Sequence, residues 1–113
     1  MREKTVEMKL NQAVRRSGGL ALKFVSPGFN GVPDRLLLFT GGKAAFAEVK
    51  APGQKPRPLQ VHRMEQLRRL GFKVFVVDSI EEIPKLIGQM TKGPGRSESP
   101  GRARRREISS GKE

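Results

Sequence analysis

The fold is decided by residues 34–50, which read DRLLLFTGGKAAFAEVK. Two apolar runs lie on either side of Gly41-Gly42, and a glycine pair between such runs is typical of the tight turn of a β-hairpin. We therefore expect two antiparallel strands, one over residues 34–39 and one over residues 44–50. Pairing through this turn brings the start of the first strand beside the end of the second.

The rest of the chain adds helices and two further strands to this hairpin. Residues 3–17 have the spacing of an amphipathic helix, and residues 20–25 form a short apolar run. Residues 59–70 predict a second helix, residues 72–77 a further strand, and a last helix follows. The order α-β-β-β-α-β-α predicts an α/β fold in which a mixed sheet is flanked by helices.

The composition divides the chain into a domain and a tail. Residues 92–113 consist mainly of Gly, Pro, Ser, Arg and Glu, and such a segment buries too little apolar surface to fold. We expect one domain over residues 1–91 and a basic, disordered tail over residues 92–113. Because a domain of this size has a thin core, we also expect a homodimer.

The strong positive charge indicates a class of partner. The formal net charge is +12, and the seven Lys/Arg and three Glu of residues 92–113 leave +8 for the domain. A basic surface favours phosphate polymers, because binding releases condensed counterions. Ribosomal and architectural proteins share this balance, so charge predicts nucleic acid as a partner but no chemistry.

Several functions are excluded by residue types. The absence of cysteine excludes disulfides, cysteine-based zinc sites and thiol nucleophiles, and the single His62 excludes paired catalytic histidines. No phosphate-binding loop is present, so we expect no nucleotide cofactor. With no apolar run of membrane-spanning length and a charged N-terminus, we expect a cytoplasmic protein without a membrane partner. There is no Trp or Tyr, and the Phe residues lie mostly in strand-like runs, which argues against recognition by base stacking.

Three charged residues stand where the hairpin strands meet. Side chains alternate along a strand, so Glu48 and Lys50 project from one side of an otherwise apolar run. Charges in such a strand are costly to desolvate unless something compensates them. Asp34 follows Pro33 at the start of the neighbouring strand and would lie beside Glu48. Two carboxylates suit Mg²⁺ or Mn²⁺. The alternatives are an exposed ion pair on an edge strand and an Asp that only forms a turn.

These residues resemble a known nuclease motif. Pro33-Asp34 followed by Glu48-Val49-Lys50 resembles the PD-(D/E)xK motif, and the wider string GVPDR, EVKAPG and then Gln60 resembles the VRR-NUC family of that superfamily. The resemblance covers about residues 3–88 and excludes the tail. It implies an α/β fold like that of restriction endonucleases, and a metal-dependent nuclease that hydrolyses phosphodiester bonds of DNA. Small standalone members resemble Holliday-junction resolvases and act as homodimers, which makes branched DNA the expected substrate.

The resemblance also implies roles for individual residues. Asp34, Glu48 and the main-chain carbonyl of Val49 would bind the metal ion, and Glu7 would complete the metal site from the first helix. Lys50 would orient the attacking water and offset the charge of the transition state. Gln60 would hold Lys50 or the water in place by a hydrogen bond.

Basic residues around this motif are candidates for contacts with the DNA backbone. We expect Lys55 and Arg57, in the loop after the motif, and Lys23 and Arg35 to bind DNA. They could equally be solvated surface residues. Two other functions remain open: a nonspecific or flap-type DNA nuclease, and a noncatalytic DNA-binding module on a decayed nuclease fold.

Overall fold

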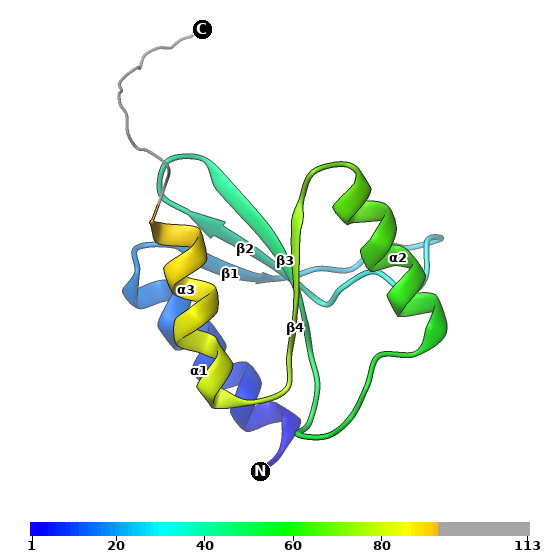
Figure 1. Ribbon diagram of the computed structural model, residues 1–113, viewed down its shortest axis with the longest axis horizontal. Coiled ribbons are helices and arrows are strands. Elements are labelled where there is room, and N and C mark those ends of the chain that lie inside the picture. The colour runs from blue at the N-terminus through cyan, green and yellow to red at the C-terminus, as the bar shows by residue number, and fades with distance from the viewer. Residues whose placement is uncertain (93–113) are drawn as a thin grey trace, which may run out of the picture.

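The computed structural model describes residues 1–92, and the predicted tail from residue 93 onward lies outside them (Figure 1). The chain forms the expected α/β fold, with one additional 3₁₀ turn before the last helix. The elements in chain order are α1 (Glu3–Arg16), β1 (Leu20–Lys23), β2 (Arg35–Phe39), β3 (Lys43–Val49), α2 (Pro58–Arg69), β4 (Lys73–Val77), η1 (Ile80–Glu82) and α3 (Ile83–Thr91). None of the helices within residues 1–92 is long and apolar enough to cross a membrane.

The four strands form one mixed sheet in the order β1-β2-β3-β4. The first three strands are antiparallel, and β4 runs parallel to β3 because α2 provides the crossover between them. The predicted hairpin is confirmed: Phe39 pairs with Lys43 next to the turn, and Arg35 pairs with Ala47 at the other end. Gly41 and Gly42 both have positive φ angles, 83° and 75°, which glycine adopts without steric cost.

Helices cover the two faces of the sheet unequally. In Figure 1, α1 and α3 lie together against one face, and α2 stands on the other side. The larger hydrophobic cluster joins α1 and α3 to the sheet through residues such as Leu10, Leu37 and Leu86. A smaller cluster under α2 contains Phe46, Met64 and Val74. The sheet face under α2 therefore has the thinner cover.

Most strands differ from the predicted bounds by one or two residues, and each difference has a local reason. β1 ends at Lys23 because the chain turns at Ser26-Pro27-Gly28, although Phe24 N–H still donates to Asp34 O over 2.9 Å. β3 ends at Val49, one residue before the Lys50 that was expected to close it. The Lys50 N–H nevertheless donates to Val77 O over 2.9 Å, which fixes this end of the sheet.

Candidate active site

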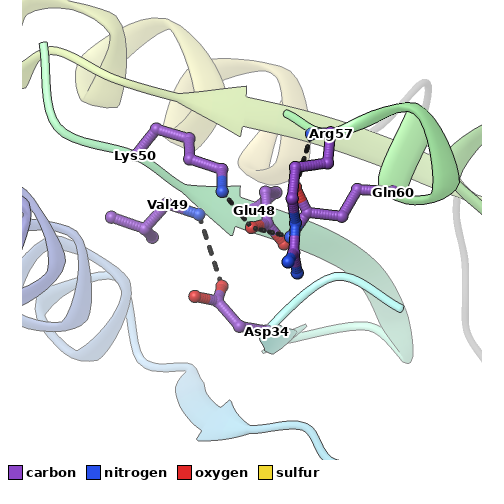
Figure 2. A network of polar contacts seen from close by, with 6 residues as sticks. All are labelled: Asp34, Glu48, Val49, Lys50, Arg57 and Gln60. Carbon is purple, nitrogen blue, oxygen red and sulfur yellow. Dashed lines mark hydrogen bonds and ion pairs between the residues drawn. The ribbon is translucent and has the colours of Figure 1, made fainter. Parts of the chain in front are cut away.

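Asp34 is held beside the end of β3 by the hairpin register. It directly precedes β2, whose first residue, Arg35, pairs with Ala47. The carboxylate Oδ1 of Asp34 accepts a hydrogen bond from the Val49 N–H over 3.3 Å (Figure 2). Pro33 is fully buried directly before it, so the backbone at this position is fixed on both sides.

Glu48 is the most deeply buried charged residue of the site, with 4% of its surface exposed. Its Oε2 accepts a hydrogen bond from Gln60 Nε2 over 3.0 Å and lies 3.3 Å from the Nζ of Lys50. Its other oxygen, Oε1, is buried and has no hydrogen-bond partner within residues 1–92. A buried carboxylate oxygen without a partner is costly, so Glu48 is prepared to accept a ligand that the protein itself does not supply.

Gln60 connects α2 to the site. Its Oε1 accepts a hydrogen bond from the Arg57 N–H over 2.8 Å at the start of α2, while its Nε2 donates to Glu48. Both ends of the buried amide are therefore used, which fixes its orientation. Figure 2 shows Asp34, Glu48, Lys50 and Gln60 gathered where β3 ends and α2 begins.

The two acids of the site disfavour each other's charge. The pKa of Asp34 is raised from its ordinary 3.8 to about 6, mainly by burial and secondly by the nearby charge of Glu48. The Val49 N–H lowers this pKa, and Glu3 raises it. The influence of Glu3 was missed from the sequence, although Glu3 lies four residues, about one helical turn, before the predicted Glu7.

The residues of the site fit a divalent cation. Asp34 and Glu48 carry two mutually repelling carboxylates, and Glu48 Oε1 has no partner, so a cation between them would relieve both costs. Within the described part of the chain, no three His, Cys, Asp or Glu side chains converge on one point. The donor set thus consists of two carboxylates, and water would complete the shell, as Mg²⁺ usually retains several waters.

Glu7 of α1 lies against Arg35 of β2. Its carboxylate forms an ion pair with Arg35, whose side chain is largely buried. Within the described residues Glu7 does not join Asp34 and Glu48 in a three-acid cluster, so its contact with a metal stays a prediction. Arg35 was expected to bind DNA, but the same ion pair turns its guanidinium toward α1.

The remaining predicted residues lie at the periphery of the site. Lys55 and Arg57 are exposed in the loop that leads from β3 to α2, and Lys23 is exposed at the end of β1. Val49 contacts Asp34 through its N–H, so a metal contact through its carbonyl stays a prediction. Of these residues, Arg57 is joined to the site, because its N–H donates to the Gln60 amide that binds Glu48.

A helix-flanked mixed sheet with Asp34, Glu48 and Lys50 at its hairpin defines a nuclease domain of the PD-(D/E)xK type. "Putative nuclease p44" of Acyrthosiphon pisum secondary endosymbiont phage 1 is 51% identical over 79 residues, which are 70% of this chain and 85% of that relative. A solved structure described as "VRR_NUC domain" is 35% identical, has a TM-score of 0.71 and is matched over 75% of this chain and 92% of its own. No sequence profile of a known family matches the chain. The chain belongs to the VRR-NUC family of nucleases.

Proposed function

We propose that the protein is a Mg²⁺- or Mn²⁺-dependent endonuclease that hydrolyses phosphodiester bonds of DNA, preferentially in branched DNA such as Holliday junctions. The observation that supports metal dependence is the nearness of Asp34 to Glu48, whose buried Oε1 has no hydrogen-bond partner among residues 1–92. The family supports the reaction class, and the positive charge supports a nucleic-acid substrate.

Asp34 and Glu48 would hold the ion, and Val49 would contribute its carbonyl oxygen. The bound ion would supply Lewis-acid polarisation of the phosphate and a lowered pKa of water. Lys50, which lies 3.3 Å from Glu48, offsets negative charge that develops on the phosphate oxygens and orients the water that attacks phosphorus. Gln60 keeps Glu48 in position through its amide. In the reaction the water oxygen bonds to phosphorus, the bond to the leaving sugar oxygen breaks, and that oxygen takes up a proton.

A homodimer explains why branched DNA is the preferred substrate in this proposal. Two active sites related by a two-fold axis would cut a symmetric junction at two equivalent positions. The exposed apolar residues on the thinly covered sheet face suit a second copy of the chain. This apolar strip consists of Leu20, Leu22, Leu70 and Phe72. Burying such residues against a partner would thicken a core that is small for one domain.

The test is cleavage of labelled four-way junctions, flaps, linear duplexes and single strands by the purified protein, with Mn²⁺, Mg²⁺ or EDTA. We expect cleavage only with metal, strongest on junctions, and none by Glu48→Gln. Cleavage of flaps or linear DNA in preference to junctions would favour a flap-type or nonspecific nuclease. Binding of all substrates without cleavage in Mn²⁺ would indicate that the protein is a noncatalytic DNA-binding module.

The dimer is tested separately by mass measurement in solution. We expect the wild type to have twice the mass of one chain, and Leu22→Asp, in the middle of β1, to shift it toward the monomer. A Val61→Asp variant, exposed on α2 outside the apolar strip, serves as the matched control. A monomeric wild type would contradict the dimer and leave the metal-site proposal standing.

A further inference from the structure

A groove runs from the active site to the loop that precedes Asp34. It has a volume of about 500 Å³ and lies between the first turn of α2, from Arg57 to Gln60, and Asn30-Gly31 of the loop. Gln60 belongs to both the groove and the active site, because its amide binds Glu48. The groove therefore adjoins the residue that holds Glu48 in place.

The loop is pressed closely onto α2 at this groove. Gly31 has a φ of 89°, and a Cβ at this position would lie only 2.8 Å from Leu59 Cγ. Arg63, about one helical turn after Gln60, donates from its Nε to Asn30 O over 2.7 Å. These contacts hold the loop in one position relative to the active site.

Phe29 stands at the tip of this loop, outside any strand. Its side chain is 45% exposed and belongs to neither hydrophobic cluster of the described residues. The guanidinium of Arg63 lies over the ring, with its Cζ 3.7 Å from the ring centroid. A second hydrogen bond, from Arg63 Nη1 to Gln66 Oε1 over 3.0 Å, fixes the guanidinium. Phe29 is thus an exposed aromatic ring held in a fixed orientation by a cation on one face.

We propose that Phe29 is a stacking platform for an unpaired base of the substrate strand, whose adjoining nucleotide lies in the groove beside Gln60. This inference rests on the proposed function and adds the substrate feature that the site recognises. Each base has a π face, so stacking on an aromatic side chain does not depend on sequence. A base inside a duplex has both faces covered by its neighbours, so the ring accepts only a base that is frayed or unpaired. A DNA branch provides such a base beside the cut.

The arrangement also explains why the platform carries a cation. Arg63 strengthens the platform by a cation–π contact and adds positive charge next to a phosphate chain. The prediction that base stacking plays no part rested on Phe residues lying in strand-like runs. Phe29 differs because the loop between β1 and β2 displays it, and the sequence alone did not show that α2 would hold this loop beside the active site.

The experiment compares two labelled ligands of equal length and charge, a short oligothymidylate and an abasic deoxyribose-phosphate chain. Affinities are measured by fluorescence anisotropy in EDTA, so that nothing is cut. We expect the wild type to prefer the thymidylate about tenfold, Phe29→Leu to bind both ligands equally, and Phe29→Trp to restore the preference. Met8→Leu is the matched control, since Met8 is similarly exposed but lies on α1; it should keep the wild-type ratio.

Each outcome tests whether Phe29 stacks on a base, independently of the proposed function. A wild type without preference for bases, or a Phe29→Leu variant that keeps the preference, overturns the platform even if the enzyme cleaves junctions normally. A preference that Phe29→Leu removes and Phe29→Trp retains supports the platform even if no DNA is cleaved. Loss of the preference in both Phe29→Leu and Phe29→Trp would mean that the ring only shapes the loop, and this also overturns the proposal.

Discussion

Gln60 and Glu48 join the first turn of α2 to the last residues of β3 through one buried hydrogen bond of 3.0 Å. The same Gln60 side chain accepts the Arg57 N–H over 2.8 Å. The start of the helix and the position of Glu48 are therefore linked by a single amide. The loop between them contains two prolines, Pro52 and Pro56, and could not by itself fix this distance.

Replacement of Gln60 by alanine should lower both the cleavage rate and the free energy of unfolding. The change removes the hydrogen bond to Glu48 and one cap of α2, so we expect about a tenfold loss of cleavage rate and a loss of roughly 1–2 kcal/mol of unfolding free energy. Both are measured with purified protein, by single-turnover cleavage and by denaturant unfolding. The His62→Ala variant, exposed on the same helix, should match the wild type. A Gln60→Ala enzyme with wild-type rates would show that Glu48 needs no such support.

Replacement of Lys50 by alanine should separate binding from cleavage. Lys50 lies next to Glu48 at the end of β3, where it can offset charge in the transition state, and we expect the cleavage rate to fall by about a hundredfold or more. DNA affinity should stay within about twofold, because Lys50 is one charge of a strongly basic surface. Lys43→Ala, at the opposite end of the same strand, is the control. Equal cleavage rates for Lys50→Ala and wild type would reject the role of Lys50.

The folded protein without metal should lose stability as the pH rises past the pKa of Asp34. The pKa of Asp34 is about 6 in the folded state against an ordinary 3.8, so the folded state holds this proton more tightly than the unfolded chain. The stabilising contribution is complete below pH 3.8 and is lost as the pH rises through about 6. Thermal melting in EDTA should therefore show Asp34→Asn becoming more stable than the wild type above pH 6. Parallel pH profiles for the two proteins would mean that the carboxyl titrates normally.

The sequence allowed the fold and the centre of the site to be predicted, but not its surroundings. The glycine turn fixes the register of the hairpin, and the register alone brings Asp34 beside Glu48. Glu7 was placed by its position on a helix, and its true partner, Arg35, depends on how α1 rotates against the sheet. The environment of Phe29 depends on the packing of a loop against α2. Both are tertiary contacts that local patterns do not encode.

Divalent metal should stabilise the folded protein through the two acids. A ligand that binds only the folded state adds about 2.7 kcal/mol of unfolding free energy at a concentration a hundred times its dissociation constant. We expect Mn²⁺ to raise the melting temperature of the wild type and to leave Glu48→Gln unchanged, because the substitution removes the charge from the unpartnered oxygen. The exposed Glu65 gives the control, Glu65→Gln, which should respond as the wild type does. An equal shift in Glu48→Gln would place the metal elsewhere.

Replacement of Glu7 by glutamine should reduce stability without changing the response to metal. The substitution leaves the largely buried guanidinium of Arg35 without its ion-pair partner, and we expect a loss of about 1–3 kcal/mol of unfolding free energy. Since Glu7 does not join the acid pair, the shift of melting temperature produced by Mn²⁺ should equal that of the wild type. A smaller shift in Glu7→Gln, together with unchanged stability in EDTA, would show instead that Glu7 leaves Arg35 and binds the ion. The melting temperature with and without metal therefore decides between a structural and a metal-binding role for this residue.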